Sequence, residues 1–112
     1  MISNADVENM ALSFPETDAH PHFHKTAYRV KKKIFATLDK EKRLLMVRLT
    51  PADQSVFCAW NRAIIYPVPG GLGRGGDTFI ELKKVPKSMC IDALRTAWCK
   101  VAPPKLAAAF QS

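Results

Sequence analysis

The chain has 112 residues, of which 47% are hydrophobic and 24% are charged, so its composition is that of a folded domain and excludes a disordered segment. No run approaches the roughly 18 consecutive apolar residues that a membrane-spanning helix needs. Residues 1–6 lack the basic start and apolar stretch of a signal peptide. We therefore expect a single cytoplasmic domain over residues 1–112, with no membrane partner.

The charge is distributed unevenly along the chain. The formal net charge is +7, but residues 1–24 carry −4 and residues 25–112 carry +11. The sequence pI is near 9.6, so polyanions are the expected partners, with nucleic acid first and an anionic membrane surface second. The alternative interpretation is that the positive charge serves solubility alone.

The first predicted element is a helix that begins after Ser3. Ser3 and Asp6 have the spacing of a capping box, in which each side chain bonds the backbone N–H of the other residue. Apolar residues follow at helical spacing and form the face to be buried: Val7, Met10, Ala11 and Phe14. A proline then ends the helix, and residues 15–24 are expected to form a polar loop.

Residues 25–49 alternate between apolar and polar side chains, which is the period of β-strands. We expect two or three consecutive antiparallel strands here, with a charged turn at Asp39–Lys42. Pro51 suits the first turn of a short helix that extends to Trp60. A short strand over Ala63–Pro67 follows, and its proline confines it to a sheet edge or strand end.

All five glycines lie between positions 70 and 76, where Gly71–Gly76 matches the pattern GxGxxG. Such a match binds dinucleotide phosphates only when it follows a strand and opens a helix. Here a run rich in β-formers follows, so a strand over Thr78–Lys84 is predicted and the match is interpreted as fortuitous. We expect a mobile loop that carries Arg74 between two strands. A small-anion pocket under this loop is kept as a further hypothesis.

A second long helix is predicted after Pro86. Its apolar stripe is formed by Cys90, Leu94, Ala97 and Val101, with Trp98 beside it in the core. Two prolines end this helix, and residues 105–110 form a final turn or short helix. The order of elements predicts an α+β fold, with an antiparallel sheet of four or more strands and helices packed on one face.

Two groups of basic residues are the candidate nucleic-acid contacts. Three adjacent lysines repel one another and favour a bound anion. The candidates are Arg29, Lys31, Lys32, Lys33 and Arg48 from the first hairpin and Arg74, Lys83 and Lys84 from the second. The alternative is that the lysine run protects a hairpin from edge-to-edge aggregation.

No residue pattern indicates catalysis. Four alternating residues would project to one side of an extended segment, and they are Asp18, His20, His22 and His24. The favoured interpretation is a solvated loop, so we expect no bound metal or cofactor. The three cysteines form no CxxC pair and are interpreted as inert thiols: Cys58, Cys90 and Cys99. No Ser, His and Asp set is recognisable, so we expect a protein that is not an enzyme.

Several short motifs, in order along nearly the whole chain, resemble the MmcQ/YjbR-like family of small bacterial proteins. They are Ser13–Thr17, Pro21–Phe23, Phe35–Leu38, Gly73-Arg74, Thr78–Leu82, Ala97-Trp98, Ala102-Pro103 and Lys105-Leu106. The resemblance implies an α+β fold similar to the frataxin-like and secretion-chaperone-like folds. Its members have been likened to "double wing" DNA-binding proteins, and it implies neither catalytic residues nor a cofactor. The chain departs from the family at Leu72, where members often carry an aromatic residue.

The leading hypothesis is a small, basic, non-enzymatic DNA-binding module that contacts phosphates through β-hairpins. The alternative is a protein-interaction or chaperone-like adaptor that binds its partner through a sheet face. Strong salt dependence of DNA binding would favour the first hypothesis.

Overall fold

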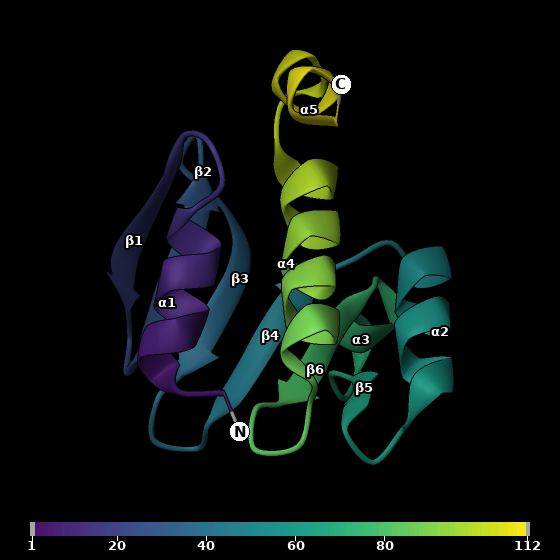
Figure 1. Cartoon of the computed structure of the whole chain (residues 1–112). Coiled ribbons are helices and arrows are strands. Elements are labelled where there is room, and N and C mark those ends of the chain that lie inside the picture. The colour runs from purple at the N-terminus through teal and green to yellow at the C-terminus, as the bar shows by residue number, and fades with distance from the viewer. Residues whose placement is uncertain (1, 112) are drawn as a thin grey trace.

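The computed structural model describes residues 2–111 and has an α+β architecture, with one six-stranded sheet and five helices (Figure 1). The strands are β1 Thr17–His22, β2 Lys25–Val30, β3 Lys33–Asp39, β4 Leu44–Arg48, β5 Ile65–Pro67 and β6 Asp77–Glu81. The helices are α1 Asn4–Leu12, α2 Pro51–Trp60, α3 Gly71–Arg74, α4 Lys87–Val101 and α5 Pro104–Gln111. The strand order is β1-β2-β3-β4-β6-β5, and all five pairings are antiparallel. The expected α+β fold with an antiparallel sheet is thus confirmed.

The long helices α1 and α4 lie side by side on one face of the sheet, and α2 lies beside β5 (Figure 1). Side chains that point toward these helices form cross-strand rows of buried residues. One such row runs Thr26, Leu38, Leu45, Ile80 and Ile65, in which the last four side chains are fully buried. Because successive side chains of a strand point to opposite faces, the alternate residues lie on the face away from α1 and α4.

The predicted capping box of α1 is present. The Ser3 hydroxyl accepts a bond from the Asp6 backbone N–H, and the Asp6 carboxylate accepts one from the Ser3 N–H, each 3.0 Å long. The expected apolar residues Val7, Met10 and Phe14 are buried. Reciprocal capping of this kind satisfies two of the free N–H groups of a helix N-terminus, so the chain enters α1 at a defined residue.

Trp98 anchors the helical layer. Its side chain is fully buried, as predicted, and its ring lies 6.0 Å from Phe14 and 4.9 Å from Phe110. The indole N–H donates to the Pro15 carbonyl oxygen at 3.2 Å, which satisfies the one polar atom of the ring. This aromatic cluster joins the end of α1, the end of α4 and the short helix α5.

The expectation of a loop over residues 15–24 is wrong in its central part. Residues 17–22 form the edge strand β1, which pairs with β2 over its whole length from Thr17 opposite Val30 to His22 opposite Lys25. Pro21 is tolerated because an edge strand does not need every N–H for the ladder. The alternation of apolar and polar residues that marks a strand is weak here, because most side chains of this edge strand are exposed.

The glycine segment also differs from the expected mobile loop, because part of it is helical. Residues 71–74 form the single turn α3, and the strand β6 follows it, so the GxGxxG match does not open a long helix. A Cβ at Gly73 would lie 1.7 Å from the Val68 carbonyl oxygen, and one at Gly76 would lie 1.9 Å from the Leu49 carbonyl oxygen. Gln54 donates to the carbonyl oxygens of Gly73 and Asp77 at 2.8 and 3.0 Å. The glycines at positions 73 and 76 therefore permit close backbone packing.

We predict that Gly73→Ala lowers the free energy of unfolding by about 2 kcal/mol or more, because the added methyl group overlaps the Val68 backbone. Gly75→Ala is the matched control, since its Cβ would lie no closer than 3.5 Å to the neighbouring atoms. The control is expected to be neutral or stabilising by up to about 1 kcal/mol. Urea denaturation of both variants measures the difference, and equal stabilities would contradict close packing at Gly73.

Candidate nucleic-acid interface

The tip of the β2–β3 hairpin presents the lysine run to solvent. Lys31 and Lys32 form a two-residue turn with φ of +50° and +68°, and both side chains and that of Lys33 are exposed. Two left-handed residues in a row match the twist of a hairpin, but such turns strongly favour Asn-Gly. Lysine at these positions costs about 1–2 kcal/mol per residue. Strained residues of this kind concentrate at functional sites.

Arg48 and Arg74 lie at the same end of the sheet as this tip. Arg48 ends β4 and donates to the Ile34 carbonyl oxygen at 3.5 Å, next to Lys33. Arg48 is also opposite Asp77, which follows Arg74 of α3 by three residues. Two strand spacings, roughly 10 Å, separate β3 from β6. We call this surface the basic end, and it comprises Arg29, Lys31, Lys32, Lys33, Arg48 and Arg74.

Two residues of the basic end are engaged by the acidic N-terminal segment. The Arg29 guanidinium bonds both carboxylate oxygens of Asp18 at 2.8 and 3.2 Å, and the Lys31 ammonium lies 2.8 Å from a Glu16 oxygen. Hydrogen bonds from these cations hold the pKa of each carboxyl below its usual value. Exposed pairs of this kind contribute little stability, so a stronger anion can compete for either cation.

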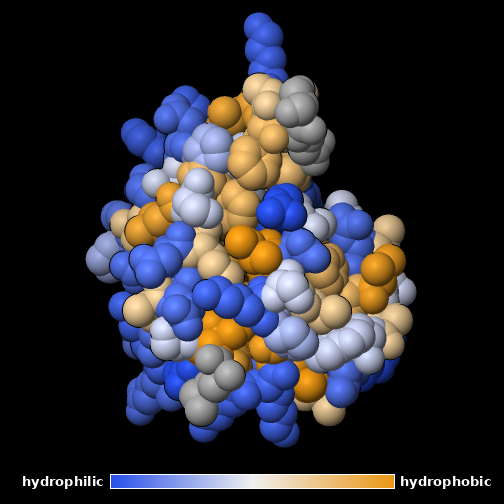
Figure 2. Space-filling view, in the orientation of Figure 1, coloured by the Kyte–Doolittle hydropathy of each residue, from blue (hydrophilic) through white to orange (hydrophobic). Residues whose placement is uncertain are grey.

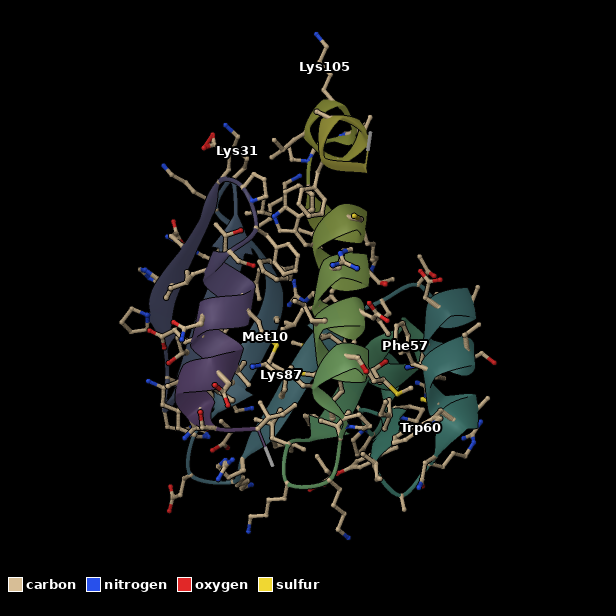
Figure 3. All side chains as sticks on the ribbon, viewed as in Figure 1. Met10, Lys31, Phe57, Trp60, Lys87 and Lys105 are labelled. Carbon is tan, nitrogen blue, oxygen red and sulfur yellow. The ribbon has the colours of Figure 1, made fainter. Side chains whose placement is uncertain are left out.

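Lys83 and Lys84 do not join the basic end. They follow β6, which runs from Asp77 opposite Arg48 to Glu81 opposite Leu44, and therefore leave the sheet at its other end. Figure 3 shows the separation, with Lys31 at the top and the turn between β6 and α4 at the bottom. The exposed Lys42, which follows β3, lies at this second end too. The predicted residues thus divide into two separate surfaces.

Sequence reasoning missed a trough on the sheet face away from α1 and α4. Two adjoining hollows of about 150 and 190 Å³ share four lining residues, Lys25, Thr37, Met46 and Phe79. One hollow extends toward Asp39 and Lys42, and the other toward Arg48, Leu72 and Asp77. The outward members of the period-two pattern indicate this surface, but only the strand order brings them together.

Cross-strand pairing explains how the floor of the trough is built. Thr37 is opposite Met46, Met46 is opposite Phe79, and Phe79 is opposite Tyr66 on β5. The rings of Tyr66 and Phe79 lie 6.0 Å apart at 63°, and the Tyr66 hydroxyl donates to Glu81. Burial and this carboxylate raise the pKa of Tyr66 to about 12. The hydroxyl bond to Glu81 holds the Tyr66 ring beside Phe79.

A buried carboxylate lies at each end of the trough. Asp39 accepts a bond from the Lys42 backbone N–H at 3.0 Å, which holds its pKa below the usual value, and His24 lies 3.5 Å away. Asp77 is 9% exposed and lines the other end near Arg48. The trough is therefore mixed in charge, with lysine and arginine between two acidic ends.

The histidine pattern has a structural basis that the sequence left open. Asp18, His20 and His22 lie on one face of β1, because they are opposite Arg29, Ala27 and Lys25 of β2. His24 lies beyond the strand and contacts Asp39. Within residues 2–111, no group of three or more His, Cys, Asp or Glu side chains is arranged to hold a metal ion.

The cysteines are placed as small core residues. Cys58 and Cys90 are buried, and Cys99 is half-buried. Burial raises the pKa of Cys90 to about 12 and raises that of Cys58. A thiol with a raised pKa is a poor nucleophile at neutral pH, because only the thiolate attacks.

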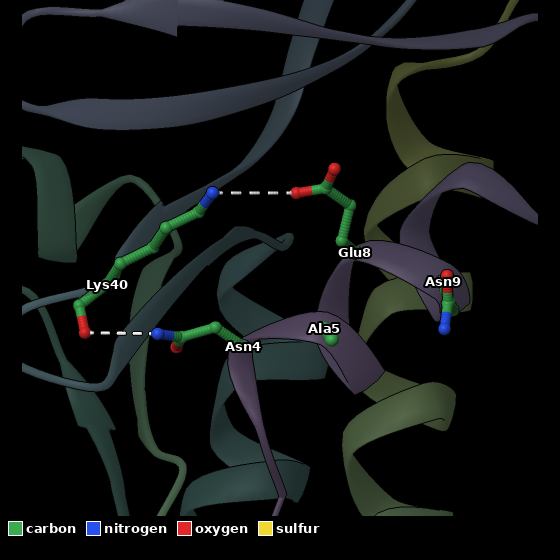
Figure 4. Close-up of a pocket in the computed structure, with 5 residues that line it drawn as sticks. All are labelled: Asn4, Ala5, Glu8, Asn9 and Lys40. Atoms are coloured by element: carbon green, nitrogen blue, oxygen red, sulfur yellow. Dashed lines mark hydrogen bonds and ion pairs between the residues drawn. The ribbon is translucent and has the colours of Figure 1, made fainter.

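A further hollow of about 260 Å³ lies between α1 and the β3–β4 turn (Figure 4). The Lys40 ammonium lies 3.7 Å from a Glu8 oxygen, and the Asn4 amide donates to the Lys40 carbonyl oxygen at 3.2 Å. Lys40 thus pairs with Glu8 through its side chain and with Asn4 through its backbone. These contacts fasten the turn to the helix, which is a structural role.

On the helix side, apolar atoms gather over α5 and the adjoining end of α4 (Figure 2). Leu106, Ala107 and Phe110 supply this area and pack against the core. Val56 and Trp60 of α2 are 72% and 45% exposed. The helix side therefore presents apolar and mixed surfaces, whereas the basic end and the trough are defined by the sheet.

Comparison with known proteins supports the fold. No protein-family model matches the sequence, and no curated protein matches it either. A solved structure, protein DR2400 of Deinococcus radiodurans with the domain DUF419, superimposes with a TM-score of 0.77. The match covers 90% of this chain and 79% of that one, at 16% identity. DUF419 is the MmcQ/YjbR family, so the likeness agrees in fold with the resemblance seen in the sequence.

No helix in the described part of the chain has the length and apolar character that crossing a membrane requires.

We predict that Lys32→Gly raises the free energy of unfolding by about 0.5–1 kcal/mol, because glycine adopts the left-handed conformation without a Cβ clash. Lys33→Gly is the matched control in the extended strand β3. It removes the same charge but is expected to lower stability by roughly 0.5–1 kcal/mol. Chemical denaturation at fixed salt distinguishes the two, and changes of the same sign would argue against a strained tip.

Proposed function

We propose that this chain is a small, non-enzymatic DNA-binding module of the MmcQ/YjbR family, formed by one domain, and that its basic end contacts DNA phosphates. The observation that carries the proposal is the exposed lysine tip, whose two central residues occupy a conformation that lysine disfavours. Glycine or asparagine would form this turn at lower cost. The positive charge of these lysines explains their presence at the turn if it binds phosphate.

The surroundings of the tip support phosphate contact. Lys32 and Lys33 are exposed, Arg48 ends β4 at the same end of the sheet, and the exposed Arg74 of α3 lies three residues before β6. Arg29 and Lys31 are held by exposed carboxylates, and a phosphate could take over these contacts. Contacts of this type position a protein on DNA but do not read its sequence, so weak sequence selectivity is expected.

We predict that DNA affinity falls steeply with salt, because each neutralised phosphate releases counterions with a slope of roughly −0.9 for duplex and −0.7 for single strands. The double variant Lys32→Gln/Lys33→Gln should lose about two phosphate contacts, which reduces the magnitude of the duplex slope by about 1.8. Fluorescence anisotropy with duplex and single-stranded oligonucleotides of mixed sequence, titrated with salt, provides the measurement.

The matched control is Lys83→Gln/Lys84→Gln, which removes the same charge at the opposite end of the sheet. If the basic end binds DNA, the control keeps the wild-type slope. Equal slopes for both double variants would show that net charge acts without a local contact. Wild-type affinity weaker than millimolar for both forms of DNA at low salt would remove the proposal altogether.

The second candidate is a protein-interaction adaptor that uses the open sheet face. It is favoured by an apolar side chain in the wall of the trough, Leu72, which is 65% exposed. A protein that stays bound at high salt and is released by Leu72→Ser, while DNA binding is absent, would support the adaptor role over the first proposal.

A further inference from the structure

We propose that the trough on the open sheet face receives one unpaired base of a single-stranded DNA segment whose phosphates lie on the basic end. This inference rests on the proposed function and narrows it from DNA in general to single strands. The trough and the basic end are continuous, because Arg48 belongs to both.

The floor of the trough suits a flat aromatic ligand. Phe79 and Met46 line both hollows, and Phe79 is held at its edge by the ring of Tyr66, 6.0 Å away. Proteins that bind single strands stack bases on aromatic side chains presented by a sheet, next to a basic path for the backbone. Phe79 is supported by its neighbours and partly exposed, which are the conditions that stacking requires.

The arrangement of charge orients the strand. Arg48 lines the trough, and Leu72 of α3 lies on its far wall. A phosphate bound by Arg48 would place the attached base over Phe79. Lys25 and His22 lie on the opposite wall, where a second phosphate could be neutralised. The buried carboxylate of Asp77 lines the trough at its Arg48 end and repels phosphate. The base therefore enters the trough at that end, and the sugar–phosphate backbone stays outside the trough.

The polar groups of the wall favour some bases over others. Asp77 offers a carboxylate, which in its ionised form accepts hydrogen bonds and donates none. Cytosine, adenine and guanine carry an exocyclic amino group that can donate to it. Thymine offers only its ring N3–H, which lies between two carbonyl oxygens that repel a carboxylate, so thymine is the weaker partner. A duplex base must first leave its stack and its partner to reach the trough. Preference for single strands, and for cytosine over thymine, follows from this geometry.

The experiment compares short labelled oligo(dC), oligo(dT) and a duplex of equal length by fluorescence anisotropy at low salt. We expect oligo(dC) to bind about tenfold more tightly than the duplex, and about fivefold more tightly than oligo(dT). Phe79→Leu, which keeps an apolar floor without an aromatic face, should weaken oligo(dC) binding about tenfold. Its salt slope should be unchanged, because Phe79 contacts no phosphate.

Phe23→Leu is the matched control, since it makes the same substitution at a 92% exposed ring outside the trough-lining residues. It should change the affinity for oligo(dC) less than twofold. Thermal melting checks that both variants fold. Asp77→Asn gives an independent readout, because an amide can donate as well as accept. In this variant the preference for oligo(dC) over oligo(dT) should fall toward one.

The outcomes separate the two proposals. Equal affinity for single strands and duplex, with Phe79→Leu binding as wild type, would overturn the base-binding trough while the lysine-dependent salt slope still supported DNA binding. A folded Asp77→Asn protein that keeps the full preference for oligo(dC) would overturn the assignment of Asp77. Absence of binding to every oligonucleotide at low salt would overturn both proposals together.

Discussion

One-sided burial of the sheet is the constraint on which the rest of the structure depends. Helices cover one face, so alternate residues of β4 and β6 are buried in the core, and most residues on that side of β2 and β3 are buried too. The remaining residues have no helical cover and must form a surface from side chains that tolerate water. Thr37, Met46 and Phe79 form a row there because strand pairing places them opposite one another. The trough is thus a consequence of the same alternation that builds the core.

The acidic N-terminal segment has a local role that its net charge does not reveal. Glu8, Glu16 and Asp18 each pair with a basic side chain of a strand or of the turn that follows one: Lys40, Lys31 and Arg29 respectively. Folding therefore brings most of the −4 segment against the +11 remainder. The positive potential is reduced along β1 and β2 and remains at the hairpin tip, around Arg48 and Arg74, and at the opposite end near Lys83 and Lys84.

The likeness to DR2400 at 16% identity shows how little of the sequence the fold requires. A core of alternating apolar strand residues under two amphipathic helices can be filled by many combinations of side chains of suitable volume. Surface residues are freer still, and function resides in surface sites that differ among proteins of one fold. The proposals for this chain therefore rest on its own basic end and trough.

The sequence by itself determined the helices other than α3 and most of the strands, because their signals are local. The Ser3–Asp6 capping box, the stripe of α4 and the alternation over residues 25–49 each depend on neighbours a few positions away. It also identified the lysine run and the buried Trp98. Its failure over residues 17–22 has the same origin, since an exposed edge strand carries little apolar alternation and is defined by its partner β2.

Only the tertiary structure decided which of these residues act together. Strand order placed Arg48 and Arg74 at the same end of the sheet as the lysine tip and Lys83 and Lys84 at the opposite end, a difference that depends on the direction of β6. It also assembled the trough from five strands and the glycine segment, which are distributed over more than fifty residues of the chain. Contacts between distant segments depend on topology and packing. A local pattern reflects only interactions between residues a few positions apart, so it does not determine these contacts.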